Sequence, residues 1–222
     1  MKTLDDTLFS TKWEILQLIA SSPKNATQLA TTLKTSLANI TQQTKLLEAY
    51  GTVLREKEET PKKVGKPRLR YRVAKDFSYI GLVTDGFAEK KSIILKDFSN
   101  AFVRSLLVMN QEEQYVFVKF LILHESILQK CPGIGLLKVT KDTIELFLHS
   151  EAVDEIRKKY SNTIISDLTG KNKKVICWTH TGFEIDEGIF RKDPYFMNMF
   201  KSMVVLQDRG GTLIKAKRQV ES

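Results

Sequence analysis

Cysteine is scarce in this chain of 222 residues, which contains only Cys131 and Cys177. The two lie far apart and form no C-x-x-C pair, whereas zinc fingers and disulfide frameworks need closely and regularly spaced cysteines. Neither class is therefore indicated, and we expect no bound metal. A single disulfide between the two residues stays open at this stage.

Long apolar runs are missing as well. The longest, Tyr115 to Leu123, is interrupted by Lys119 and is much shorter than the roughly 18 residues of a membrane-spanning helix. The N-terminal segment MKTLDDTLFS has two acidic residues and no apolar stretch of the kind that signal peptides carry. We therefore expect a cytoplasmic protein with no membrane partner.

Signatures of nucleotide-binding and hydrolytic enzymes do not occur. The chain has no G-x-G-x-x-G, no G-x-x-x-x-G-K-[ST] and no G-x-S-x-G segment. These motifs place backbone amides around phosphates or present a nucleophilic serine. Their absence leads us to expect a protein that is not an enzyme, with no catalytic residue and no cofactor.

Basic residues, in contrast, are plentiful and unevenly placed. The chain has a formal net charge of +9, with 42% hydrophobic and 27% charged residues, as in a soluble globular protein. Residues 1–76 hold 14 Lys and Arg against 8 Asp and Glu, which leaves +6 in the first third of the chain. This excess predicts a polyanionic partner, and nucleic acid is favoured over a membrane because no basic amphipathic helix occurs.

Three helical segments are predicted at the start of the chain. The first spans residues 10–20 after a cap at Ser10, the second spans residues 28–34 after a cap at Thr27, and the third spans residues 36–50. Gly51 follows the third helix, as is common at helix C-termini. Because only a short turn at Thr35 and Ser36 separates the last two helices, we predict a helix-turn-helix.

The third helix has two different faces. Ile40, Thr44 and Leu47 recur at helical spacing and form the expected buried stripe, flanked by Leu37 and Leu46. The other face holds amide, hydroxyl and ammonium groups that can hydrogen-bond to base edges: Asn39, Thr41, Gln42, Gln43 and Lys45. Taken alone, this segment also fits an ordinary amphipathic surface helix.

A basic hairpin is predicted after this helix. Residues 52–58 and 69–73 have strand character, and the segment between them contains Pro61, Gly65 and Pro67. The cations of this region are Lys62, Lys63, Lys66, Arg68, Arg70 and Arg72. A basic run can be merely a solvated loop, but a helix for the major groove followed by a basic hairpin for the backbone is typical of a winged helix.

A known family shares these motifs. The run ITQQTKLLEAYGTV (residues 40–53) resembles the recognition-helix signature of ArsR-like winged-helix repressors, and VGKPRLRYRV (residues 64–73) resembles the basic wing of their archaeal relatives. The resemblance covers residues 8–75 and implies that Ile40, Leu46 and Leu47 are core. It also implies DNA contacts from the polar face. Thr44 stands where the family usually has leucine, and the metal-sensing cysteine motif of classical members is absent.

Residues 77–131 are predicted to connect two domains. Residues 77–95 are ambiguous between strand and helix, and we assign them to a linking segment. Helices are expected from Asp97 or Ser99 to Met109 and from Glu112 to about Lys130. The second is apolar nearly all round, so it is either the central helix of a domain or a dimer seam. We favour a share in dimerisation, with Val116 and Leu123 facing outward, since such regulators act as symmetric pairs.

The last part, residues 132–222, is predicted to be an α+β domain with no recognised family. Strands are expected at residues 134–139, 143–148, 174–178 and 212–217, and helices at residues 151–160 and near residues 195–205. The whole chain is thus expected to be α+β, with a winged helix-turn-helix domain (1–76), a helical connector (77–131) and an α+β effector or assembly domain (132–222).

Candidate chemistry in this last part is sparse. Cys177, His180, Asp186 and Glu187 lie close in sequence, yet C-x-x-H is a weak metal signal, and a buried structural thiol is favoured for Cys177 over a ligand or a nucleophile. Aromatic residues are favoured as core but could line a pocket for an acidic effector, anchored by Arg191 and Lys192. They are Trp178, Phe183, Phe190, Tyr195, Phe196 and Phe200.

The sequence thus predicts a dimeric, sequence-specific DNA-binding transcription regulator with a C-terminal domain that senses a small-molecule effector or joins subunits. The alternative is an enzyme or RNA-processing factor that uses the winged helix only for docking. The residues expected to contact double-stranded DNA are Ser36, Asn39, Thr41, Gln42, Gln43, Lys45, Lys62, Lys63, Lys66, Arg68 and Arg70.

Overall fold

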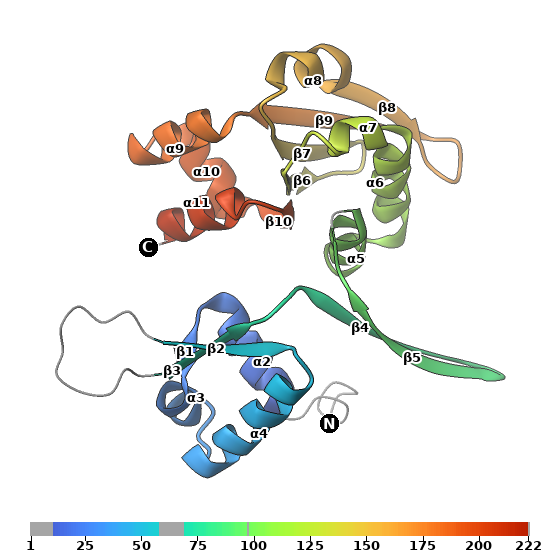
Figure 1. Ribbon diagram of the computed structural model, residues 1–222. Coiled ribbons are helices and arrows are strands. Elements are labelled where there is room, and N and C mark those ends of the chain that lie inside the picture. The colour runs from blue at the N-terminus through green and yellow to red at the C-terminus, as the bar shows by residue number, and fades with distance from the viewer. Residues whose placement is uncertain (1–10, 58–68, 97, 222) are drawn as a thin grey trace. The chain divides into compact units, whose positions relative to one another are not determined.

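The chain forms two compact units, residues 1–95 and residues 96–222. The computed structural model describes residues 11–57, 69–96 and 98–221, and it is mixed α+β (Figure 1). The first unit contains the predicted helices and basic hairpin region. The second contains a five-stranded sheet. Each unit is described by itself below.

The first unit combines helices with a small three-stranded antiparallel sheet. Its sheet has the strand order β1-β3-β2. The elements are α2 (Thr11–Ser21), β1 (Lys24–Asn25), α3 (Ala26–Thr32), α4 (Leu37–Ala49), β2 (Val53–Lys57) and β3 (Leu69–Val73). All three predicted helices and both strands are present, with boundaries shifted by a few residues.

One core holds the first unit together. It joins the helices to the sheet through Ile15, Ile19, Leu29, Ile40, Leu47, Val53 and Tyr71, all buried. The cap of α3 is Asn25 and not Thr27, because Asn25 and Gln28 exchange two hydrogen bonds of 2.9 Å in a capping box. After the C-terminus of α4, Gly51 has a φ of +66°, the left-handed conformation that glycine tolerates best.

Two positions of α4 differ from the expectation. Leu46 is 39% exposed, so its assignment to the core is wrong, whereas Leu47 beside it is buried. Thr44 is fully buried, and its hydroxyl donates to the Ile40 carbonyl at 2.9 Å. A helical threonine can satisfy its hydroxyl within its own helix in this way. The side chain thereby fits a core position.

Residues 77–95, assigned to a linking segment, form a hairpin: the strand character of residues 77–83 is confirmed, and the alternative that residues 87–95 begin a helix is wrong. Strands β4 (Phe77–Thr84) and β5 (Phe87–Ile94) pair antiparallel over eight residue pairs and form a sheet of their own. Gly86 in the connecting turn has a φ of +75°. Asp-Gly is a strong signal for a two-residue hairpin turn, so the Asp85-Gly86 pair marked the reversal in the sequence.

The second unit is built around a sheet with the strand order β10-β6-β7-β9-β8. Strands β7 and β9 are parallel, and the other neighbouring pairs are antiparallel. Its elements are α5 (Phe98–Val108), α6 (Gln111–Leu123), α7 (Glu125–Leu128), β6 (Gly133–Val139), β7 (Thr143–His149), α8 (Val153–Tyr160), β8 (Asn162–Ser166), β9 (Asn172–His180), α9 (Gly182–Phe190), α10 (Pro194–Ser202), β10 (Val204–Asp208) and α11 (Thr212–Glu221).

Helices cover both faces of this sheet. In β7, Leu146 and Leu148 belong to a core shared with α6 and α8, and Phe147 belongs to a second core shared with α9, α10 and α11. Successive residues of a strand point to opposite faces, which accounts for the division. Residues 212–217, expected as a strand, instead begin helix α11, and β8, β10 and α9 were not predicted.

Helix α6 is part of the core of its own unit. Val116 and Phe117 are fully buried there, so the prediction that Val116 faces outward is wrong. Ile122 and Leu123, at the end of the helix, are 62% and 59% exposed. The predicted helix from Glu112 to Lys130 is divided into α6 and α7 at His124. The expected connector thus holds a hairpin in the first unit and helices in the second.

Separate replacement of two adjacent leucines by alanine tests how α4 packs. Leu47→Ala removes a buried side chain and should lower the free energy of unfolding of the first unit by about 2 to 5 kcal/mol. Leu46→Ala, on the exposed side, should cost less than about 1 kcal/mol. In a Trp178→Phe background, Trp13 in α2 is the remaining tryptophan and reports unfolding in urea. Equal losses for the two variants would contradict the packing.

Candidate functional site

The outward face of α4 is the first candidate site. Gln42 and Lys45 are exposed, and with Leu37, Ala38 and Thr41 they line a shallow open depression on the helix surface. Among the described residues, neither the Gln42 amide nor the Lys45 ammonium group takes part in a hydrogen bond or ion pair. Both groups can therefore meet a partner without first breaking an internal hydrogen bond.

A second row of polar residues on α4 is occupied internally. The Asn39 side-chain amide donates to the Thr35 hydroxyl at 3.0 Å, and the Gln43 amide donates to the Asn39 side-chain oxygen at 3.2 Å. Asn39 and Gln43 are half-buried. They brace the turn between α3 and α4 more than they face outward, a distinction that the spacing in the sequence did not give.

Ser36 and Thr41 also have local partners. The Ser36 hydroxyl caps α4 by accepting from the Asn39 backbone amide at 3.1 Å. The Thr41 hydroxyl donates to the Leu37 carbonyl at 2.8 Å. Among the predicted α4 contact residues, Gln42 and Lys45 are thus the most available to a partner.

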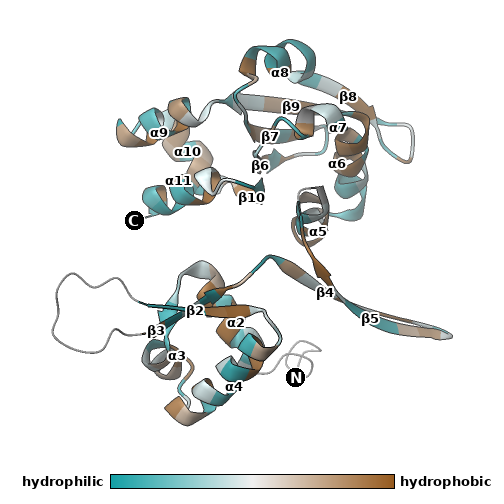
Figure 2. Ribbon diagram, in the orientation of Figure 1, coloured by the Kyte–Doolittle hydropathy of each residue, from teal (hydrophilic) through white to brown (hydrophobic). Residues whose placement is uncertain are grey.

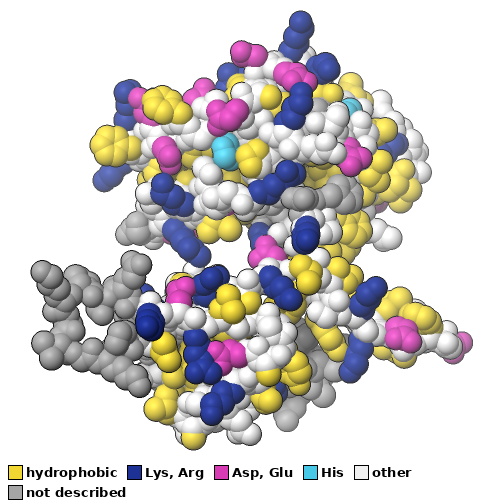
Figure 3. Space-filling view, in the orientation of Figure 1, with side chains coloured by type: hydrophobic (Ala, Val, Ile, Leu, Met, Phe, Trp, Pro, Cys, Tyr) yellow, Lys and Arg dark blue, Asp and Glu magenta, His cyan; other side chains and the backbone are white. Residues whose placement is uncertain are grey.

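Ion pairs compensate part of the positive charge on the small sheet. Arg55 forms a bidentate pair with Glu48, whose hydrogen bonds raise the pKa of the guanidinium above its ordinary value. Arg72 lies 2.8 Å from Glu56. Figure 3 shows Lys and Arg side chains spread over the visible face of the first unit.

Of the five hairpin residues predicted to contact DNA, only Arg70 lies within the described residues. Arg70 is half-buried on β3, opposite Glu56 of β2 and Asn25 of β1. The four remaining residues, Lys62, Lys63, Lys66 and Arg68, lie outside the described residues. Their contribution to the site therefore rests on their charge alone.

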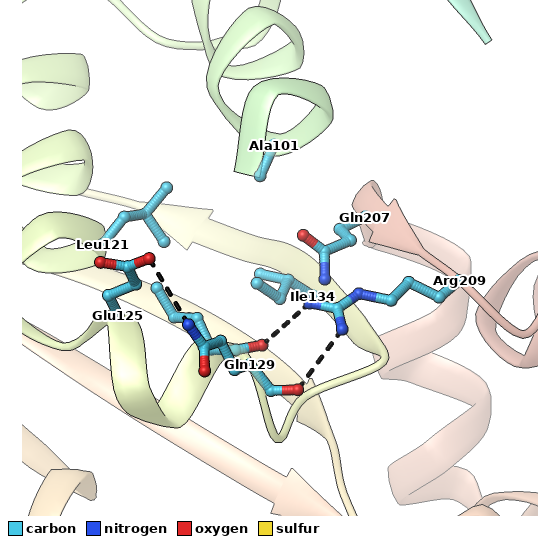
Figure 4. Close-up of a pocket in the computed structure, with 8 residues that line it drawn as sticks. Ala101, Leu121, Glu125, Gln129, Ile134, Gln207 and Arg209 are labelled. Atoms are coloured by element: carbon cyan, nitrogen blue, oxygen red, sulfur yellow. Dashed lines mark hydrogen bonds between the residues drawn. The ribbon is translucent and has the colours of Figure 1, made fainter. Parts of the chain in front are cut away.

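A cavity of about 320 Å³ in the second unit is lined by polar groups that are already paired (Figure 4). Arg209 donates to the carbonyls of Gln129 and Leu128 at 3.4 Å each, and Gln207 donates to the Cys131 carbonyl at 3.1 Å. These bonds tie the end of β10 to the segment after α7. We interpret the arrangement as structural.

A second cavity, of about 560 Å³, is better suited to a small ligand. Arg157 lies at its side and donates to the Thr179 carbonyl at 2.7 Å, while the Trp178 ring is 39% exposed. His180 hydrogen-bonds to the Tyr195 hydroxyl at 2.9 Å and stacks on Phe147. A cation, two aromatic rings and a polar pair thus converge, as in many ligand sites.

Burial favours the neutral forms of the polar pair in this cavity. Burial lowers the pKa of His180 below its ordinary value, although Glu184 at 3.3 Å opposes the shift. Burial likewise raises the pKa of Tyr195. Arg157 is the cation of the cavity, and Glu184, 3.9 Å from it, is the nearby anion.

The predicted aromatic pocket forms only in part. Trp178 and Tyr195 line the cavity, but Phe196 and Phe200 lie in the core, and Phe183 and Phe190 are exposed outside it. The predicted anchors do not reach the cavity: Arg191 pairs with Glu187 at 2.6 Å, and Lys192 follows it on the surface. The sequence missed Arg157, whose place depends on how α8 packs beside β9.

Metal and nucleophile chemistry find no geometric basis in the part of the chain that the structure describes. No group of three or more His, Cys, Asp or Glu residues there could hold a metal ion. Cys131 and Cys177 are free and buried, so the two do not form a disulfide. Desolvation raises their pKa values to about 11 and about 12.

No family model matches the sequence, and neither does any curated protein. Along the described residues, no helix has both the length and the apolar character needed to cross a membrane. What the protein does is therefore inferred from its own residues.

The two cysteines should be unreactive in the folded protein. With pKa values of about 11 and about 12, roughly one thiol in a thousand or fewer is ionised at pH 8, and burial also blocks access. A disulfide reagent such as Ellman's should react slowly with native protein and with both thiols after unfolding in guanidinium. Fast reaction of native protein at pH 8 would contradict the buried positions.

Proposed function

We propose that this protein is a sequence-specific DNA-binding transcription regulator and that its first unit works as a winged helix-turn-helix. The observation that carries the proposal is the outward face of α4, on which Gln42 and Lys45 are exposed with no internal partner among the described residues. The opposite face of α4 is buried in the core. The helix is thereby fixed while its polar groups remain available.

The arrangement of α3 and α4 supports this proposal. Lys34 has a φ of +50° in the turn between them, and the Thr35 amide donates to the Ala30 carbonyl at 3.1 Å. The two helices are therefore joined by a short, hydrogen-bonded turn. Strands β2 and β3 follow directly, as the two sides of a wing would.

The chemistry of the exposed groups suits base recognition. A glutamine amide can form two hydrogen bonds with adenine in the major groove, and a lysine can donate to guanine. The basic residues between β2 and β3 would contact phosphates, which strengthens binding to any sequence. Specificity and affinity would thus come from different residues of the same unit.

In the second unit, we assign a small-molecule effector to the cavity beside Arg157, Trp178 and Tyr195. The guanidinium and the two rings favour a planar aromatic acid over an aliphatic one. The effector is thus acidic, as expected from the sequence, but Arg157 takes the place of Arg191 and Lys192 as its anchor.

Gln42 should determine sequence preference, and Gln43 serves as its matched control. Gln42→Ala should lower the preference for the best duplex over scrambled DNA by about 1 to 3 kcal/mol while nonspecific affinity persists. Gln43→Ala should have a smaller effect because its amide is bonded to Asn39. Fluorescence anisotropy with both duplexes measures this. Full preference in the Gln42 variant would overturn the assignment.

Neutralising the basic segment should have the opposite effect. Exchange of Lys62, Lys63 and Lys66 for Gln should weaken binding to all duplexes alike. The salt dependence of log K should flatten by about 0.9 for each phosphate that the protein no longer neutralises. Titrations at several salt concentrations measure the slope, and an unchanged slope would show that these residues do not meet phosphates.

A competition experiment separates this function from the RNA-directed alternative. A regulator should prefer duplex DNA containing its site, whereas an RNA-processing factor should prefer structured or single-stranded RNA. If single-stranded RNA displaces the labelled duplex from the protein at a concentration equal to that of the duplex, the RNA-directed alternative would be favoured.

A further inference from the structure

The hairpin formed by β4 and β5 lacks a core of its own. It is a separate two-stranded sheet, and every residue from Tyr79 to Ser92 is exposed. Figure 1 shows the two strands running side by side along their length. An isolated two-stranded hairpin is only marginally stable in water, and three or more strands are generally needed. The hairpin therefore has the form of an incomplete sheet.

Both faces of the hairpin carry exposed apolar side chains. Successive residues of a strand point to opposite faces, so Tyr79 and Val83 lie on one face of β4 and Ile80 and Leu82 lie on the other. Their exposed fractions are 55% for Tyr79, 82% for Val83, 40% for Ile80 and 53% for Leu82. All four belong to β4.

The two edges of the hairpin differ in charge. β4, FSYIGLVT, has no charged residue and no proline, whereas β5 has Glu89, Lys90 and Lys91 at its centre. Figure 2 shows this central part of β5 as hydrophilic. Charged residues on an edge strand oppose pairing with another chain, and an uncharged edge invites it. β5 is thus protected, and β4 is open to a further strand.

We propose that β4 pairs antiparallel with β4 of a second copy of this chain and that Gly81 lies on the two-fold axis. The result is a four-stranded sheet in the order β5-β4-β4-β5. In this register Gly81 is opposite its own copy, Tyr79 is opposite the partner's Val83, and Ile80 is opposite the partner's Leu82. Ser78 is opposite the partner's Thr84, so apolar residues meet apolar ones and polar residues meet polar ones.

Neighbouring registers match less well. With Ile80 on the axis, Ser78 would be opposite the partner's Leu82, and with Leu82 on the axis, Ile80 would be opposite the partner's Thr84. A shift of the axis by one residue thus sets a hydroxyl against an aliphatic side chain. Since cross-strand pairs are the unit of sheet stabilisation, self-complementarity about Gly81 favours a second copy over an unrelated strand.

The charges of β5 complete the match. Lys91 is opposite Ile80, and Glu89 is opposite Leu82. In the four-stranded sheet, the row through Ile80 and the partner's Leu82 therefore ends in Lys91 on one side and the partner's Glu89 on the other. The two symmetric rows place four aliphatic side chains together between charges of opposite sign.

This pairing gives a structural form to the dimer on which the proposed function rests, since the hairpin belongs to the same unit as α4. Operator symmetry would then mirror the symmetry of the protein. The hairpin takes the place of α6, whose Val116 and Phe117 are buried in their own unit. Exposed Ile122 and Leu123 make a helix-based dimer the alternative outcome.

A single cysteine on the axis tests the pairing. Gly81→Cys brings two thiols together because directly opposite Cα atoms lie about 4.5 to 5.5 Å apart. A disulfide needs Cα atoms within about 7 Å. The substitution is sterically open, with no atom within 4 Å of an added Cβ and no positive φ. Cys131 and Cys177 are buried and do not compete.

Lys90→Cys is the matched control. Lys90 is opposite Gly81 within the hairpin, on the same face but on the outer strand. In the proposed sheet, its two copies are about three strand spacings, or ~14 Å, apart. Under mild oxidation, the Gly81 variant should give a covalent dimer on nonreducing gels, and the Lys90 variant should not. Equal crosslinking of the two variants would overturn the pairing.

Sedimentation supplies a measurement that needs no new thiol. Val83→Asp and Ala88→Asp add the same charge to opposite members of one residue pair, on β4 and on β5. The first should weaken the dimer by at least about tenfold and the second should have a much smaller effect. Circular dichroism checks that both variants remain folded.

The outcomes separate this inference from the proposed function. Suppose that the wild-type protein is a dimer, that neither cysteine variant crosslinks, and that Leu123→Glu dissociates the dimer. This result would refute pairing through the hairpin and leave a dimeric regulator. A wild-type protein that is monomeric at tens of micromolar would refute the dimer itself. Sequence-specific DNA binding is measured independently, by the Gln42 and Gln43 pair.

Discussion

Burial of one stripe of α4 is the constraint on which the first unit depends. Ile40, Thr44 and Leu47 are buried against the other helices and the sheet, and this fixes the rotation of the helix about its own axis. Once the rotation is fixed, Gln42 and Lys45 must face outward. The same packing lets Thr44 keep its hydroxyl inside the helix, so a polar residue occupies the core without an unpaired group. The proposed recognition surface follows from the core.

The second unit obeys a different constraint. Its sheet is covered by helices on both faces, and Phe147 and Leu148 illustrate how one strand serves both cores. Because both faces are covered, only the loops and strand ends of such a sheet are accessible to a ligand. The cavity beside Arg157 lies at such an end, where β8 stops pairing with β9 at Asn162. By contrast, every residue from Tyr79 to Ser92 in the hairpin of the first unit is exposed. The proposals place ligand binding in the second unit and assembly in the first.

The sequence predicted best where local signals were strong. Helical spacing located α2, α3 and α4, and Gly51 marked the end of α4. Signals were also present where the prediction was wrong: Thr181 and Glu184 form the capping box of α9, and Asp85-Gly86 marks the hairpin turn. In α11 the alternation at its start resembles a strand, but the buried residues Leu213 and Ala216 follow helical spacing. These features were recoverable from the residues alone.

Other features depend on tertiary contacts and could not be predicted. Arg157 and Tyr195 meet at one cavity because α8 packs beside β9 and Tyr195, at the start of α10, hydrogen-bonds to His180 at the end of β9. No local pattern encodes these contacts. Leu46 is exposed and Leu47 is buried because adjacent residues of a helix point in different directions around its axis. Periodicity alone does not settle such a difference when both residues are leucine.

Selection of bound duplexes from a random pool tests the central claim, that the outward face of α4 reads a defined DNA sequence. The account predicts enrichment of one motif in two inverted copies, with half-sites about 34 Å or one helical turn apart, as for two-fold pairs of recognition helices. The full chain is used for the selection, and a pool of random single-stranded RNA, selected in parallel with the same protein, provides the comparison. Recovery of no DNA motif, together with an enriched RNA motif, would contradict the account.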